Sequence, residues 1–172
     1  DSSESRGLGD VYKRQLYGLE GIPSLSEEII LERDLKILEY TGGKLFIPTI
    51  STSKSVELIK NAKQKGLQII TSVSINNLFF NEKKLKNFDT RFKVLPPIRS
   101  EEDRLILVKA LSEGVIDFCT SDHSPIDIDN KKTDFKNSLF GATGLESIFG
   151  GLNSLYKTCL LYTSDAADET VR

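Results

Sequence analysis

The stretch LFIPTISTSKSVELIKNAKQKGLQIITSV, residues 45–73, decides the fold of this protein. Its two ends, residues 45–50 and 67–73, are short apolar runs rich in β-branched side chains, a composition typical of buried strands. Between them, Ser53 is expected to cap a segment with helical spacing of apolar residues, which ends at Gly66. A strand, a helix and a second strand in this order predict two parallel strands joined by a right-handed crossover.

A further helix is predicted directly upstream, over residues 24–41. Ser24 and Glu27 have the spacing of a capping box, in which each side chain accepts a hydrogen bond from the backbone N–H of the other residue. Gly42 and Gly43 end the helix, because glycine readily adopts the left-handed conformation found after a helix. The helix therefore leads directly into the first strand.

Strands and helices continue to alternate downstream. We expect a third extended piece at residues 92–95, a helix over residues 100–113 and a fourth strand at residues 115–120. A doubly wound sheet and a (β/α)₈ barrel both fit this pattern, and a barrel requires about 250 residues, so the chain would be part of one. In both folds, chemistry gathers at the carboxyl ends of the strands. Those ends are Thr49, residues 72–77, Leu95 and Asp122.

Composition limits the classes of function. The 172 residues include 23 Lys and Arg against 25 Asp and Glu, a net charge of −2, so there is no basic stripe for binding nucleic acid. No apolar run approaches the roughly 20 residues of a membrane-spanning helix. Two cysteines in a chain of this length do not make a disulfide framework, which favours a reducing compartment such as the cytoplasm.

Both ends of the chain are expected to be foreign to the protein. The chain has no Met and begins at Asp1, as a fragment would. Residues 10–15 read DVYKRQ and residues 159–164 read CLLYTS; one codon choice for the first, reverse-complemented and read in a shifted frame, encodes the second. This inverted repeat resembles the transposase ends of sequencing libraries. We therefore expect residues 1–15 and 159–172 to be translated adapter sequence, and residues 16–158 to be the protein domain.

The pair Asp122-His123 is the sharpest candidate for chemistry. A carboxylate at the carboxyl end of a strand can ligate a metal or act as a general base. Neighbouring side chains on a strand alternate in direction, so His123 is not expected to point the same way as Asp122. The alternative is structural, with Asp122 capping the following turn and backbone groups satisfying His123. With one His and no His or Cys cluster at ligand spacing, composition alone gives a metal site little support.

Two other motifs leave two interpretations open. Asn76-Asn77 follows the second strand and suits either a polar turn or a site. Gly141-x-x-Gly144 suits either a turn or the close approach of a backbone to a ligand.

Seven ordered motifs between Gly18 and Leu152 resemble those of the dihydroorotases, in the amidohydrolase superfamily. They are GLEGIPS at 18–24, ISTxxSV at 50–56, DTRFKVxPPIR at 89–99, EDR at 102–104, GVID at 114–117, SDHSP at 121–125 and FGxxGLE at 140–146. The resemblance implies a partial (β/α)₈ TIM barrel that contains only the later strands.

The resemblance also implies an activity. Dihydroorotases reversibly hydrolyse the cyclic amide of dihydroorotate to N-carbamoyl-aspartate in pyrimidine synthesis, with one or two zinc ions that generate hydroxide and polarise the amide carbonyl. Asp122 stands at the position of an aspartate that ligates the metal and shuttles the proton. Phe140 and Gly141 match a segment whose backbone contacts the substrate.

The chain departs from the family at several site positions. Thr49, Leu95 and Ile126 stand where the family has a zinc-ligand His, a substrate-binding Asn and a His that holds the substrate carboxylate. The family's P-H-H-L is Ile75-Asn76-Asn77-Leu78 here. A threonine hydroxyl is a poor zinc ligand, and each lost hydrogen bond to a charged group is worth on the order of 1.5–3 kcal/mol. We therefore expect a site that has decayed or been repurposed.

Two hypotheses follow from the resemblance and its departures. The first is a cyclic amidohydrolase with a reduced zinc site, acting on a small molecule, in which Asp122 is the base and a metal ligand. The second is a non-catalytic subunit that keeps the barrel to bind aspartate carbamoyltransferase, the preceding enzyme of the pathway. A homo-oligomer is compatible with both, and this fragment alone is expected to be inactive.

Overall fold

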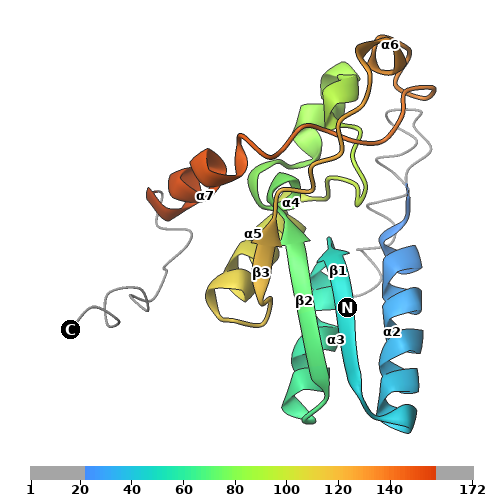
Figure 1. Ribbon diagram of the computed structural model, residues 1–172, viewed down its shortest axis with the longest axis vertical. Coiled ribbons are helices and arrows are strands. Elements are labelled where there is room, and N and C mark those ends of the chain that lie inside the picture. The colour runs from blue at the N-terminus through green and yellow to red at the C-terminus, as the bar shows by residue number, and fades with distance from the viewer. Residues whose placement is uncertain (1–21, 158–172) are drawn as a thin grey trace, which may run out of the picture.

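A computed structural model describes residues 22–157 of the chain (Figure 1). Both segments interpreted as adapter sequence lie outside this range. The strands are β1 (Lys44–Ile50), β2 (Gln68–Ser74) and β3 (Phe118–Thr120). The helices are α2 (Ser24–Thr41), α3 (Ser53–Gln64), α4 (Ile75–Phe79), α5 (Glu101–Ser112), α6 (Ile128–Lys131) and α7 (Ile148–Lys157), with 3₁₀ turns at Glu82–Asn87 and Thr90–Phe92.

The three strands form one parallel sheet in the order β1-β2-β3. Phe46 lies opposite Ile70 in the first pair, and Ser72 lies opposite Phe118 in the second. Helix α3 connects β1 to β2, and α5 lies on the connection from β2 to β3. The parallel pairing predicted from residues 45–73 is therefore confirmed.

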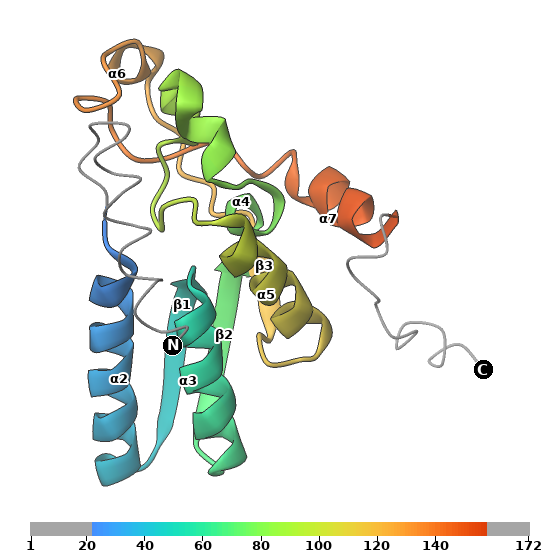
Figure 2. The same ribbon diagram turned by 180° about the vertical axis from the view of Figure 1, so that it is seen from behind.

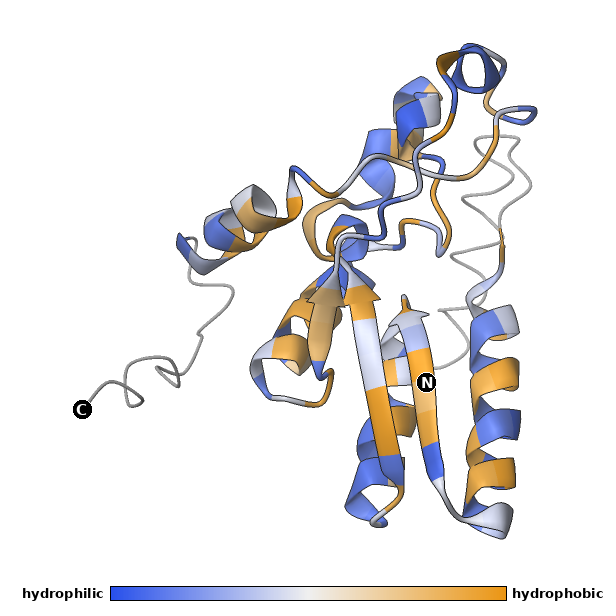
Figure 3. Ribbon diagram, viewed as in Figure 1, coloured by the Kyte–Doolittle hydropathy of each residue, from blue (hydrophilic) through white to orange (hydrophobic). Residues whose placement is uncertain are grey.

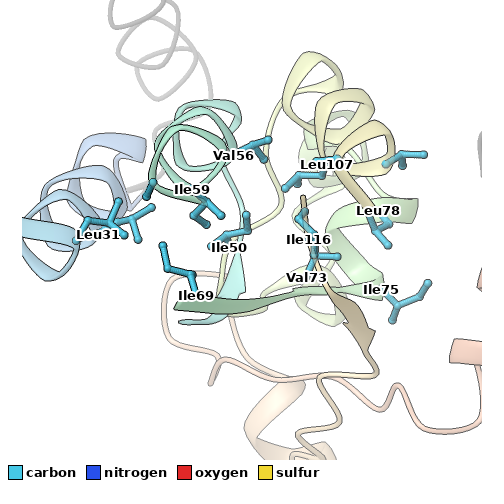
Figure 4. Close-up of a cluster of buried hydrophobic side chains, with 14 of the residues drawn as sticks. Leu31, Ile50, Val56, Ile59, Ile69, Val73, Ile75, Leu78, Leu107 and Ile116 are labelled. Carbon is cyan, nitrogen blue, oxygen red and sulfur yellow. The ribbon is translucent and has the colours of Figure 1, made fainter. Parts of the chain in front are cut away.

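One face of the sheet is covered by helices and forms the core. Figures 1 and 2 show α3 and α5 on the same side of the sheet, with α2 beside α3. Between these layers, Ile59, Leu107 and Ile116 are fully buried together with Val73 (Figure 4). Fully burying an aliphatic side chain of this size contributes about 1.5–3 kcal/mol, so this cluster fixes the helices on the sheet.

The opposite face of the sheet is apolar and exposed. Phe46, Ile70 and Phe118 keep 55%, 49% and 41% of their surface accessible, and each of the three strands carries apolar residues (Figure 3). The rings of Phe46 and Phe118 stack with centroids 6.0 Å apart and planes within 7°. A layer built from alternate strands is the arrangement inside a (β/α)₈ barrel, whereas a doubly wound sheet has helices on both faces. The described residues therefore form part of a barrel.

We expect this exposed face to make the 172-residue chain associate with itself. Replacing both rings, Phe46→Ser with Phe118→Ser, should shift the chain toward the monomer in sedimentation and reduce the binding of a hydrophobic dye. Phe149→Ser is the control, because Phe149 is 80% exposed but lies on α7, away from the sheet. Equal association of the two variants would contradict this prediction.

Two predicted strands differ in the structure. Residues 92–95 form no strand: Thr90–Phe92 is a 3₁₀ turn, and Pro96 and Pro97 that follow have no N–H to donate to a ladder. The fourth strand is only Phe118–Thr120, because the N–H groups of Val115 and Ile116 both donate to Ala110 O at the end of α5. Leu95 is therefore not a strand end, and its side chain is 56% exposed.

The predicted capping residues of two helices also differ. Helix α2 begins after Pro23, and no side chain caps it, so the capping box of Ser24 and Glu27 is wrong. Thr52, rather than Ser53, is the N-cap of α3, and its side chain accepts from Ser55 N. The Glu27 carboxylate, which the capping box assigns to its own helix, instead binds the start of α3. Within residues 22–157, no helix is long and apolar enough to span a membrane.

Candidate functional site

The carboxyl end of β1 is irregular where it carries Thr49. The register with β2 shifts between Ile47 and Ile50, and Thr49 has a φ of 37°, which is strained for a β-branched residue. Its backbone N–H donates to Ser72 Oγ at 3.1 Å. A buried serine of β2 thus fixes this strand end.

Asp122 follows β3 directly and faces the end of β2. Ser74 Oγ donates to Asp122 Oδ2 at 3.3 Å, and Asp122 has a left-handed φ of 47°. Burial raises the pKa of the Asp122 carboxyl, while the hydrogen bond from Ser74 acts in the opposite direction. A carboxylate with a raised pKa is a better proton acceptor than an ordinary aspartate.

The raised pKa gives a pH-dependent prediction for stability. Because the folded state favours the protonated carboxyl, the stability from this group is complete below its unfolded-state pKa and is lost as pH rises through its folded-state pKa. Asp122→Asn should therefore raise Tm at pH 7, and the gain should disappear in acid; asparagine also suits the left-handed φ. Ser74→Ala should instead lower Tm at pH 7. Thermal unfolding across pH measures both, and an Asp122→Asn Tm at or below wild type at pH 7 would contradict the prediction.

His123 is satisfied by backbone groups, as the structural alternative predicted. Its Nδ1 accepts from Gly144 N at 3.2 Å and from Leu145 N at 3.3 Å. A Cβ on Gly144 would lie 2.1 Å from Ser121 O, so only glycine permits this approach. For Gly141-x-x-Gly144 the structure therefore assigns a packing role to Gly144, and His123 belongs to the scaffold.

A buried polar cluster, missed by the sequence interpretation, lies beside the end of β1. The Glu27 carboxylate accepts from Ser51 N at 2.9 Å, Ser51 Oγ at 2.5 Å, Thr52 N at 3.2 Å and Ser55 Oγ at 2.7 Å. Arg99 donates to Ser51 Oγ at 3.0 Å and to Ile22 O at 2.6 Å. Ser51, Thr52 and Ser55 are at most 1% exposed. We call these side chains the Glu27 cluster.

The Glu27 cluster explains three of the sequence motifs. Its side chains come from α2, from residues 50–56 and from Arg99 of the motif at 89–99, and Arg99 also donates to Ile22 O, which belongs to the motif at 18–24. The backbone N–H of Ser53, the first residue of α3, donates a hydrogen bond to Asp103 Oδ1 at 2.8 Å. The start of α3 is thus held by two carboxylates of the chain itself. Glu27 and the hydroxyl-rich run after β1 are visible in the sequence. Nothing in the sequence indicates that they contact each other.

Lys93 fastens the loops that cross the strand ends. Lys93 Nζ donates to Phe135 O and Lys136 O, both at 2.8 Å, and lies 4.8 Å from the centre of the Phe140 ring. Gly141 N donates to Lys93 O at 3.0 Å. A Cβ on Gly141 would lie 2.6 Å from Ser124 O, and its φ is 141°. The Phe140-Gly141 segment is therefore held close to the loop that follows β3.

A cavity of about 330 Å³ lies between α4 and these loops, beyond the end of β2. Of the predicted site residues, it brings together Asn76, Ile126 and Gly141. Thr49, Leu95, Asp122 and Phe140 do not line it. The other lining residues are Phe80, Arg91, Phe92, Val94, Ile98, Lys131, Ala142, Thr143 and Ser147.

The donors at the described strand ends do not fit zinc. Within residues 22–157, no three His, Cys, Asp or Glu side chains lie close enough to hold one ion. Asp122 and His123 are the zinc-type ligands at these ends; Asp122 accepts from Ser74 Oγ, and His123 Nδ1 is bound by two backbone N–H groups. Cys119 lies in β3, where burial raises the pKa of its thiol to about 11, so it is protonated at neutral pH.

Comparisons with known proteins identify relatives of this region. No protein-family model matches the chain. It is 40% identical over 139 residues to a dihydroorotase of Thermoanaerobacter sp. (strain X514), covering 81% of this chain and 32% of that protein. It is 37% identical over 132 residues to the dihydroorotase of Bacillus subtilis (strain 168), covering 77% and 31%. The chain thus spans about a third of the length of the curated relatives it matches.

Solved structures agree on the fold. An L-hydantoinase (dihydropyrimidinase) from Arthrobacter aurescens superposes with a TM-score of 0.74 at 27% identity, covering 81% of this chain and 32% of that one. A D-hydantoinase gives a TM-score of 0.73 at 23% identity over the same shares. The partial barrel predicted from the sequence is therefore confirmed.

Proposed function

Because this chain belongs to the dihydroorotase-like amidohydrolases, we propose that the full-length protein is a cyclic-amide hydrolase by descent whose dihydroorotate site is degenerate. One observation carries the proposal. Among residues 22–157, the zinc-type ligands that follow the carboxyl ends of β1, β2 and β3 are Asp122 and His123, and His123 Nδ1 is already bound by backbone N–H groups. Thr49 and Asn76 offer a hydroxyl and an amide where the resemblance implies histidines.

The positions proposed for substrate recognition support the same conclusion. Leu95 is exposed and apolar, and Ile126 places an aliphatic side chain in the cavity. The N–H of Gly141 is already engaged with Lys93 O, so it is not free to donate to a substrate. Asp122 remains able to accept a proton, which is the role we propose for it if the full-length protein retains activity.

Zinc content and turnover test this proposal together. We expect the purified full-length protein to hold far less than one zinc per chain and to hydrolyse no dihydroorotate. The double variant Thr49→His with Asn76→His should bind more zinc than wild type; histidine also tolerates the left-handed φ at position 49 better than threonine. Stoichiometric zinc with dihydroorotate hydrolysis in the wild-type protein would contradict a degenerate site.

A second candidate function is a non-catalytic subunit that binds aspartate carbamoyltransferase. The specific observation in its favour is that the buried Glu27 cluster and the His123 contacts are complete, while the ligand positions of the family are substituted. Retention of scaffold without ligands is what a binding subunit requires. Wild type and Asp122→Asn should then elute equally with the carbamoyltransferase in gel filtration, and separate elution of wild type would exclude this candidate.

A further inference from the structure

Residues 126–141 line part of the cavity beyond the end of β2, and we call this segment the lid. It contains α6 and lies beyond the carboxyl ends of the strands in Figure 1. Three of its residues line the cavity, as do the buried side chains of Val94 and Ile98. We propose that the lid opens as one unit while the sheet stays folded, and that a latch of two lysines holds it closed. This inference goes beyond the proposed function and is independent of it.

Two lysines tie the lid to the 3₁₀ turn that begins at Thr90, and they do so in opposite directions. Lys131, on the lid, donates from Nζ to Thr90 O at 3.0 Å and to Lys93 O at 3.2 Å. Lys93, at the end of the turn, donates from Nζ to Phe135 O and Lys136 O of the lid, both at 2.8 Å. Each lysine thus reaches into the segment that carries the other.

Backbone and hydroxyl groups of the same two segments complete these contacts. Thr90 Oγ1 donates to Lys131 O at 2.7 Å, and Gly141 N donates to Lys93 O at 3.0 Å. The contacts of the lid therefore converge on one short turn. We call Thr90, Lys93 and Lys131 the latch.

The lid is held by hydrogen bonds more than by buried apolar surface. Ile128, Leu139 and Phe140 of the lid keep 63%, 50% and 44% of their surface exposed. The strand beneath it differs, because Ile69 and Val73 of β2 belong to the buried core. Segments with few buried apolar contacts open at a lower free energy than the core of the same protein. The lid is therefore the part of this region that can open alone.

The latch also carries positive charge that the closed lid leaves unbalanced. The lysine hydrogen bonds end on neutral carbonyls, and the nearby carboxylate of Asp89 binds Arg91. Burial lowers the pKa of both lysines; the charge of Lys93 lowers that of Lys131 further, while Asp89 acts in the opposite direction. Opening returns both ammonium groups to water, so the closed lid is held against an electrostatic cost.

Hydrogen exchange of the unmodified full-length protein tests whether the lid opens alone. The N–H of Gly141 is hydrogen-bonded to Lys93 O, and that of Val73 lies in the core of the sheet. We expect the Gly141 amide to exchange at least tenfold faster than the Val73 amide, because lid opening exposes the first and not the second. Equal exchange of the two amides would overturn the inference.

Cysteine reporters measure access to the cavity directly. Ile98 is 6% exposed and lines the cavity, whereas Val108 is 2% exposed and lies in the core on α5. A thiol reagent should label Ile98→Cys at least tenfold faster than Val108→Cys, which requires opening of the core. Mass spectrometry of the labelled peptide separates each reporter from native thiols such as Cys119.

Variants of neighbouring lysines test the latch. Lys131→Met removes the ammonium group and keeps a long apolar side chain, so labelling of Ile98→Cys should become at least tenfold faster again. Labelling of Val108→Cys should not change. Lys132→Met is the matched control, because Lys132 is the exposed neighbour and is not part of the latch, and it should leave both rates unchanged.

The outcomes separate the lid from the latch and from the proposed function. Equal labelling of Ile98→Cys and Val108→Cys would show that the cavity is reached only by unfolding, which overturns the lid. Equal acceleration by Lys131→Met and Lys132→Met, or of both reporters, overturns the latch. Hydrogen exchange decides the question even if a cysteine variant does not fold. Zinc content and dihydroorotate turnover enter none of these measurements, so the proposed function fails or holds separately.

Discussion

Glu27→Ala is expected to lower the free energy of unfolding of the full-length protein by about 3–5 kcal/mol, the range measured when one partner of a buried ion pair is removed. The carboxylate accepts four hydrogen bonds from Ser51, Thr52 and Ser55, all of which are at most 1% exposed. Without the carboxylate, these buried N–H and O–H donors lose their acceptor. The Arg99 guanidinium, only 10% exposed, would also lose its neighbouring charge 3.9 Å away.

Two comparisons separate the Glu27 cluster from helix effects. Glu32→Ala removes a carboxylate from the exposed side of the same helix, where Glu32 has only a Lys36 contact at 3.3 Å, and should cost less than about 1 kcal/mol. Glu27→Gln keeps the shape but loses the charge, so its cost should be intermediate. Urea unfolding measures all three, and equal losses for Glu27→Ala and Glu32→Ala would show that the cluster contributes nothing.

Gly144→Ala is expected to destabilise the protein by about 1–3 kcal/mol or more, the range for overpacking a close contact. The added Cβ would lie 2.1 Å from Ser121 O, a backbone atom that cannot rotate away. Relief of the clash must move the chain around Gly144 and stretch the hydrogen bond from its N–H to His123 Nδ1.

Gly150→Ala is the matched control for this change. Gly150 lies inside α7, and its Cβ would meet nothing within 4 Å. Alanine is a better helix former than glycine by about 0.8–1 kcal/mol, so this variant should be slightly more stable than wild type. Thermal unfolding with hydrogen exchange over residues 141–147 measures both variants. If Gly144→Ala unfolds and exchanges like wild type, the close approach to Ser121 does not constrain the loop.

Much of the fold could be predicted because its signals are local. The apolar runs before Ile50 and Val73, with a helical repeat between them, specify a strand, a helix and a strand whatever else the chain does. Asp122 could be placed at the carboxyl end of a strand for the same reason. Residues 92–95 were misassigned because an apolar run predicts burial but not pairing, and the adjacent prolines cannot continue a ladder.

Part of the candidate site could be predicted only from the family resemblance. Thr49, Leu95 and Ile126 stood out as substitutions, but the sequence placed Leu95 at a strand end, where the structure leaves it exposed and outside the cavity. The structure instead gathers Ile126, Asn76 and Gly141 around one cavity. These residues are up to 65 positions apart, and their distances depend on how the loops cross the sheet.

By itself, the sequence determined the unit of β1, α3 and β2, its parallel pairing and the family resemblance, since these depend on periodicity and on motifs within short stretches of chain. The tertiary structure alone decided that Glu27 binds the start of α3 instead of capping its own helix, and that His123 is bound by backbone N–H groups. It also decided that Arg91 donates to the carboxylate of Asp89 and that Lys131 donates to three backbone carbonyls. A polar side chain has several possible partners of similar energy, and only the packed fold selects which of them lie within hydrogen-bond distance.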